Sequence, residues 1–85
     1  MSRERYLAVL RAAAHWDRVV AIEPTDEAAH RELIRSHLEQ GNRQAAIRQF
    51  ERLREVLRDE LGVGPDAISV ELYEQVLAAE GHEAP

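Results

Sequence analysis

Apolar residues recur at steps of three and four along most of this chain, and short breaks divide them into four blocks. This spacing places side chains on one face of an α-helix, whereas a half-buried strand would require strict alternation. The breaks fall at Pro24, at Gly41-Asn42 and at Gly62 to Pro65, residue types that end helices or turn the chain. The commonest residues are good helix formers, with 13 Ala, 12 Glu, 11 Arg and 9 Leu. The pattern predicts an all-α fold of about four helices and no sheet.

The predicted helices span residues 3–22, 26–40, 43–61 and, from Asp66 or Ala67, up to 79. Thr25 or Asp26 is suited to cap the second helix, and Gly41 to end it with a positive φ. For the first segment two alternatives stay open, because Ala13-Ala14-His15 favours one continuous helix while Asp17 could cap a second one. Residues 81–85 are expected to form a frayed end.

Each predicted helix has an apolar stripe that we expect to face the core. The stripe of the first helix is so wide that this helix needs neighbours on two sides. The expected stripes are Tyr6, Val9, Leu10, Ala13, Trp16 and Val20; Ala29, Leu33, Ile34, His37 and Leu38; Ala46, Phe50, Leu53, Leu57 and Leu61; and Ile68, Leu72, Tyr73, Val76 and Leu77.

The spacing of large and small residues also matches the tetratricopeptide repeat, a pair of antiparallel helices. The matching positions are His30-x2-Leu33-Ile34-x2-His37 and Ala46-x3-Phe50, and Ala12-x3-Trp16 before Pro24 repeats the second half. A small residue such as Ala46 lets two helices approach, and Phe50 fills the space between them. Departures occur at His30, Ile34, His37 and Arg58. We therefore expect tetratricopeptide-like antiparallel helical hairpins without a consensus array.

Composition and charge restrict the class of protein further. With 85 residues and no Cys, the chain is expected to be a single domain, 1–85, without disulfides or thiolate metal sites. No apolar run is long enough to cross a membrane, so a cytoplasmic location is expected. The net charge of −5 is unevenly placed, because residues 59–85 hold seven acids and no basic residue. This acidic segment is either a solvated face or the place where a basic partner would bind.

The sequence contains no constellation that indicates catalysis, so we expect no enzyme, no cofactor and no small-molecule substrate. His30 and His37 are seven residues apart, about 10 Å along a helix, too far to chelate one metal ion. Both are expected to pack or to form hydrogen bonds. Glu51 and Glu55 interrupt the arginines of the third predicted helix, which argues against a nucleic-acid surface there.

The stretch from Glu23 to Leu77 resembles the bacterial transcriptional activator domain, a tetratricopeptide-like module of bacterial regulators. The residues that carry this resemblance are Glu23 to Leu33, Gly41-Asn42-Arg43, Ala46 to Leu53, Glu60-Leu61-Gly62-Val63-Gly64-Pro65 and Leu72-Tyr73. The most specific part is the E-L-G-x-x-P break that is followed by L-Y. The resemblance implies a part of a larger regulator, of the antibiotic regulatory protein type or of the large ATPase-containing type.

The resemblance implies a protein–protein or interdomain interaction module in the regulation of DNA-templated transcription. Its partners would be neighbouring domains of the regulator or a second copy, in a possible homodimer, and DNA would be contacted only through a domain absent from this chain. Aromatic and Arg side chains are favoured interface anchors, and the candidates are Tyr6, Trp16, Arg48, Arg52, Tyr73 and Leu77. The alternative is a stand-alone tetratricopeptide-type adaptor that clamps a peptide carboxylate with Arg31, Arg35 and Asn42.

Overall fold

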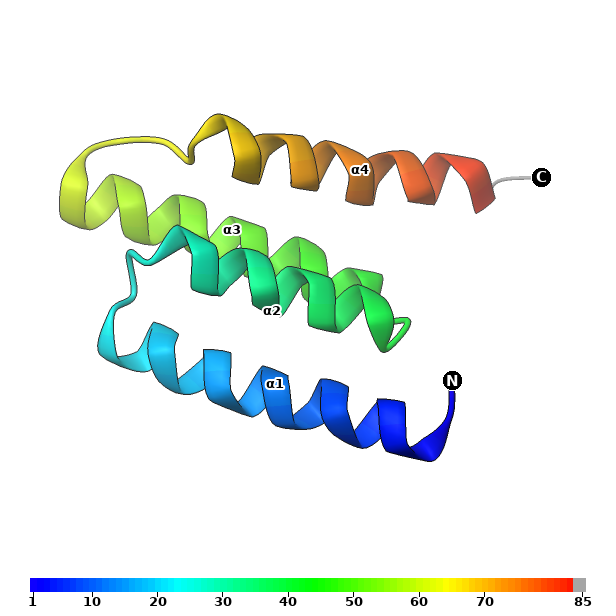
Figure 1. Cartoon of the computed structure of the whole chain (residues 1–85). Coiled ribbons are helices and arrows are strands. Elements are labelled where there is room, and N and C mark those ends of the chain that lie inside the picture. The colour runs from blue at the N-terminus through cyan, green and yellow to red at the C-terminus, as the bar shows by residue number, and fades with distance from the viewer. Residues whose placement is uncertain (84–85) are drawn as a thin grey trace.

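The computed structural model describes residues 1–83, and side chains as far as residue 79. This part of the chain forms α1 (Arg3–Ile22), α2 (Glu27–Glu39), α3 (Arg43–Leu61) and α4 (Ala67–Glu83), and it contains no strand. Consecutive helices run antiparallel, in a row from α1 at one edge to α4 at the other (Figure 1). The all-α, four-helix prediction is confirmed. We call this row the helix stack.

Local capping chemistry sets where three of the helices begin. The side chains of Ser2, Asp26 and Asn42 each accept a hydrogen bond, 3.1 Å long, from the backbone N–H three residues later. Such caps satisfy amides that the first turn of a helix leaves without a partner. Asp26, rather than Thr25, is therefore the cap of α2, and Asn42 caps α3.

Glycines end two of the helices by adopting the left-handed backbone conformation. Gly41 has φ +72°, just after α2, and Gly62 has φ +67° at the end of α3. Residues with a Cβ rarely adopt this region, which explains why glycine occupies both positions. The predicted helix ends at Gly41 and Gly62 are confirmed. At α1 the structure decides between the two alternatives, because Arg3–Ile22 is one continuous helix.

The end of α4 is the boundary that differs most from the prediction. The helix continues to Glu83, four residues beyond the expected end at Ala79. Gly81 weakens a helix by about 1 kcal/mol relative to Ala but does not forbid it, and no proline occurs before Pro85. The last two residues of the expected frayed end, Ala84 and Pro85, lie outside the described residues.

Two clusters of buried apolar side chains hold the helix stack together. One joins α2, α3 and α4 through Ile34, Ala46, Phe50, Leu72 and Val76. The other joins α1 to α2 through Val20, Ala29 and Leu33, with Ala13, Trp16 and Val19 packed against it. Ala46 is fully buried and Phe50 is 4% exposed, so the predicted small-and-large pair does pack between helices.

Five residues of the predicted stripes are exposed and do not belong to the core. Tyr6 and Leu10 of α1 are 46% and 37% exposed, Leu61 at the end of α3 is 60% exposed, and Ile68 and Leu77 of α4 are 58% and 41% exposed. α1 contacts α2 and no other described helix, so no described helix packs against the far side of its wide stripe. Leu61 is the last residue of α3 and Ile68 is the second residue of α4, so both lie beside the connection between these helices.

Candidate interaction surfaces

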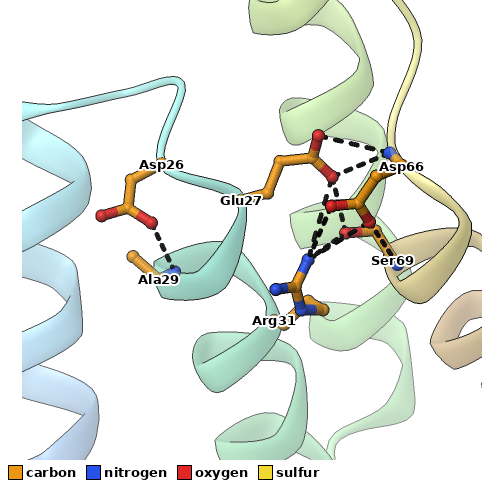
Figure 2. Close-up of polar contacts among 6 residues, drawn as sticks. All are labelled: Asp26, Glu27, Ala29, Arg31, Asp66 and Ser69. Carbon is orange, nitrogen blue, oxygen red and sulfur yellow. Dashed lines mark hydrogen bonds and ion pairs between the residues drawn. The ribbon is translucent and has the colours of Figure 1, made fainter.

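A polar cluster joins the start of α2 to the start of α4 and so positions α4 in the helix stack (Figure 2). The Glu27 carboxylate accepts hydrogen bonds from the Asp66 backbone N–H, at 3.0 and 3.2 Å, and from the Ser69 hydroxyl, at 2.7 Å. The Arg31 guanidinium donates to the same hydroxyl at 2.8 Å. Ser69 is fully buried, and these bonds satisfy its hydroxyl as both donor and acceptor. The cluster therefore fixes the first turn of α4 against α2.

Asp66 belongs to this cluster and also caps α4. Its carboxylate accepts a hydrogen bond of 2.9 Å from the Ser69 backbone N–H and lies 3.3 Å from the Arg31 guanidinium. The Ser69 N–H, followed by smaller contributions from the Ser69 hydroxyl and the Arg31 charge, lowers the pKa of the Asp66 carboxyl below its ordinary value. Asp66 is therefore ionised at neutral pH, which suits the first turn of a helix.

His30 is fully buried and joins three parts of the chain. Its Nε2 lies 2.7 Å from the Pro24 carbonyl oxygen, and its Nδ1 lies 2.9 Å from the Gln49 amide nitrogen. A carbonyl accepts and an amide nitrogen donates, so this pairing requires a neutral ring with the proton on Nε2. Burial lowers the pKa of His30, and the Arg52 charge lowers it further against the opposing effect of the Pro24 carbonyl. The prediction that His30 is a hydrogen-bonding residue of the interior is confirmed.

The six residues predicted as interaction anchors are spread over three helices. Tyr6 and Leu77 are 46% and 41% exposed, and Arg48 and Arg52 are also exposed. Trp16 is half-buried against the α1–α2 cluster, with its ring centroid 4.7 Å from that of His15. Tyr73 is half-buried and stacked on Phe50, with 4.0 Å between centroids and 5° between ring planes. Trp16 and Tyr73 therefore support the core as well as reaching the surface.

The structure groups these six residues by helix rather than into one patch. Tyr6 and Trp16 lie on α1, at one edge of the helix stack, and Tyr73 and Leu77 lie on α4, at the other. Arg48 and Arg52 line a shallow depression on α3 together with Glu51, Glu55 and Val56. The arginines of this depression alternate with glutamates, as the sequence indicated.

Two exposed faces contain residues that sequence reasoning missed. On α1 the face consists of Leu7, Leu10 and Ala14 with Arg3, Arg11 and Arg18, which we call the α1 outer face. On α4 it consists of Val70 and Leu77 with Glu71 and Glu74, which we call the α4 outer face. Leu7 and Val70 are 40% and 38% exposed. The width of the apolar stripe in the first helix was the one sequence signal that pointed to such a face.

The residues proposed for a peptide clamp all have partners within the fold. Arg31 binds the cluster at the start of α4, Arg35 lies 3.0 Å from the Glu32 carboxylate, and Asn42 caps α3. Arg35 also lies between two grooves, one on the α1 side of α2 and one on the α4 side. Neither Arg31 nor Asn42 lines either of these grooves, so the three residues do not converge on one of them.

The described residues contain no group of three or more His, Cys, Asp or Glu side chains placed to hold a metal ion. None of the helices in this part of the chain combines the length and the apolar character that spanning a membrane requires.

The family model of the bacterial transcriptional activator domain matches residues 4–77, which include α2, α3, all of α1 except its first residue and most of α4. Comparison with curated proteins and with solved structures finds no match. The family is one of non-catalytic regulatory domains. The matched residues make up far more than half of the chain, so this protein belongs to the bacterial transcriptional activator domain family.

Proposed function

We propose that this chain is a protein–protein interaction module of a bacterial transcriptional regulator, which acts in the cytoplasm on DNA-templated transcription by packing against another domain or another copy. The observation that carries this proposal is the exposure of apolar side chains at both edges of the helix stack. Leu7 and Leu10 are 40% and 37% exposed on α1, and Val70 and Leu77 are 38% and 41% exposed on α4. Contiguous apolar patches rimmed by polar residues are typical of protein interfaces.

The arrangement of the helices supports this role. In a row of antiparallel helices, an edge helix has one side in contact and one side open, as in the terminal units of tetratricopeptide-like stacks. Capping units of such stacks normally carry a polar outer face. Here both edge helices keep apolar outer residues, which favours a function in which these faces are covered by a partner.

The alternative of a stand-alone peptide-binding adaptor is less well supported. A carboxylate clamp would need Arg or Asn donors that converge on a groove. Arg31 and Asn42 instead donate to or cap other parts of the fold, and Arg35 is paired with Glu32. The geometry therefore favours packing of apolar helix faces over capture of a peptide terminus.

The proposal is tested by substitution in the native gene, followed by measurement of the transcriptome. We expect Leu10→Asp and Leu77→Asp each to reproduce at least part of the transcript changes caused by deletion of the gene, because a charge on either face opposes packing. Gln44→Asp, at an exposed site on α3 outside both faces, is the matched control and should resemble wild type. Wild-type transcript profiles in both Leu variants, together with a clear deletion profile, would contradict the proposed function.

A further inference from the structure

The two edge helices have apolar faces of similar length that no described part of the chain covers. Leu7, Leu10 and Ala14 follow one another at steps of three and four on α1, and Val70 and Leu77 are seven residues apart on α4. Both spacings keep the side chains on one side of a helix. With 20 residues in α1 and 17 in α4, the helices are about 30 and 25 Å long. The apolar stretches, residues 7–14 and 70–77, each extend over about 12 Å of their helix, so they match one another in length.

The charges around these two faces are opposite in sign. α1 carries four arginines against two acids; Arg3, Arg11 and Arg18 belong to its outer face, and the exposed Glu4 and Asp17 border it, so the face keeps an excess of positive charge. α4 carries four glutamates and no Arg or Lys, and Glu71 and Glu74 belong to its outer face. Pairing α1 with α1 would bring arginines together, and pairing α4 with α4 would bring glutamates together. Complementary charges favour α1 against α4, and like charges disfavour the two symmetric alternatives.

We propose that the partner of each face is a second copy of this chain, with α1 of one copy packed against α4 of the next. In this arrangement Leu7 and Leu10 contact Val70 and Leu77, and Arg11 and Arg18 lie near Glu71 and Glu74. The direction of the helices fits, because α1 of the next copy continues the antiparallel alternation of the row in Figure 1. This inference rests on the proposed function and names the partner and the two surfaces.

The contact is head-to-tail, so it uses different surfaces on its two sides and does not close on itself in a pair of molecules. Each dimer keeps one free α1 outer face and one free α4 outer face, and further copies add to them. We therefore expect the average mass to grow with concentration beyond that of a dimer. Because exposed charges are screened by salt, high ionic strength should weaken the association.

The experiment is analytical ultracentrifugation of the whole chain across the micromolar range, at low and at high salt. Two blocked variants remove the apolar contacts of one face each without adding charge. The α1-blocked variant carries Leu7→Gln and Leu10→Gln. The α4-blocked variant carries Val70→Gln and Leu77→Gln. All four side chains are 37–41% exposed, and Gln is a good helix former, so both variants should stay folded. Circular dichroism melting verifies this.

We expect each blocked variant to be a monomer alone and the mixture to form a dimer of one copy of each, with no larger species. This result follows because the mixture contains one competent α1 outer face and one competent α4 outer face per pair. Self-association of the α4-blocked variant would indicate α1–α1 pairing, and self-association of the α1-blocked variant would indicate α4–α4 pairing. Either result would overturn the head-to-tail contact.

Charge reversal provides a second, independent readout. Glu71→Arg with Glu74→Arg should abolish association of the otherwise unchanged chain, by placing arginines opposite Arg11 and Arg18. The matched control is Glu51→Arg with Glu55→Arg, the same change at two exposed positions of α3, and it should keep the wild-type masses. If the wild-type chain stays a monomer at high micromolar concentration, the second copy is not the partner. The transcriptome test above is independent of this result, so the two proposals fail separately.

Discussion

Glu27 and Ser69 are 42 residues apart in sequence, and the Ser69 hydroxyl donates a hydrogen bond of 2.7 Å to the Glu27 carboxylate. The same carboxylate accepts from the Asp66 backbone N–H, so one side chain of α2 satisfies two donors in the first turn of α4. The Glu27 side chain is 19% exposed and Ser69 is fully buried, so water has limited access to replace these bonds. This contact ties the last helix to the rest of the helix stack.

We expect Glu27→Ala to lower the free energy of unfolding by about 1–3 kcal/mol, the cost of leaving buried polar groups without partners. The Ser69 hydroxyl would lose its acceptor, and the Asp66 N–H would lose its carboxylate. Urea denaturation followed by circular dichroism measures the change.

Glu32→Ala is the matched control for this prediction. Glu32 lies on the same helix and pairs with Arg35, but its side chain is 43% exposed. Exposed pairs contribute little, so the control should change stability by less than about 0.5 kcal/mol. Equal losses for the two variants would mean that the α2–α4 cluster has no special importance.

The connection between α3 and α4 offers a test of backbone strain. Gly62 has φ +67°, whereas Gly64 lies outside the left-handed region, and a Cβ at either position would meet no atom within 4 Å. Any difference between Gly62→Ala and Gly64→Ala therefore reflects the backbone and not crowding. We expect Gly62→Ala to lower the free energy of unfolding by about 1–2 kcal/mol. Gly64→Ala should leave it unchanged or raise it by up to about 1 kcal/mol. Thermal and urea denaturation of both variants measures these changes. A larger loss of stability in Gly64→Ala than in Gly62→Ala would contradict the prediction.

The boundaries of the helices could be predicted from sequence because neighbouring residues determine them. Asn42 caps α3 by accepting a hydrogen bond from the backbone N–H three residues later. Gly41 adopts a positive φ directly after α2, a conformation that its own residue type favours. Ala46 and Phe50 were also predictable, since small and large residues at that spacing fit two packed helices.

The exposed faces and the polar cluster depend on residues far apart in sequence, which is why they could not be predicted. Periodicity shows that Leu10 and Ile68 are on apolar sides of helices, but not whether another helix covers them. Glu27 is suited to the first turn of any helix, and nothing near it in sequence shows that Ser69 lies beside it. For the same reason the anchors Tyr6 and Leu77 could be chosen by residue type but not assigned to opposite edges of the helix stack.

The stacked rings of Phe50 and Tyr73 should be energetically coupled. Their centroids are 4.0 Å apart, and aromatic pairs contribute about 0.5–1.5 kcal/mol beyond the area that they bury. A double-mutant cycle with Phe50→Leu and Tyr73→Leu should yield a coupling energy in this range. The control cycle combines Phe50→Leu with Val20→Ala, which belongs to the other core cluster. It should be additive within about 0.5 kcal/mol. Additivity in both cycles would show that the ring contact adds nothing to simple burial.

The buried imidazole of His30 should make stability depend on pH. Burial lowers its pKa from the ordinary value of 6.5, so in the folded state the ring stays neutral at pH values where the unfolded chain already binds a proton. In this window the unfolded state binds more protons, and the free energy of unfolding therefore decreases as pH falls. The loss begins near the unfolded pKa of 6.5 and ends at the lower folded pKa. Its slope for one proton is at most about 1.4 kcal/mol per pH unit.

Urea denaturation at a series of pH values from neutral down to mildly acidic measures this slope in wild type and in His30→Gln. The variant loses stability at every pH because the hydrogen bonds to Pro24 and Gln49 change. The informative quantity is therefore the slope, which should be smaller in the variant below pH 6.5. Nitrogen NMR of the imidazole tests the same assignment directly, because a neutral ring with its proton on Nε2 gives a distinct pair of ring nitrogen shifts. Parallel pH profiles, or a ring that is protonated in the folded state at neutral pH, would show that His30 is not held neutral by burial.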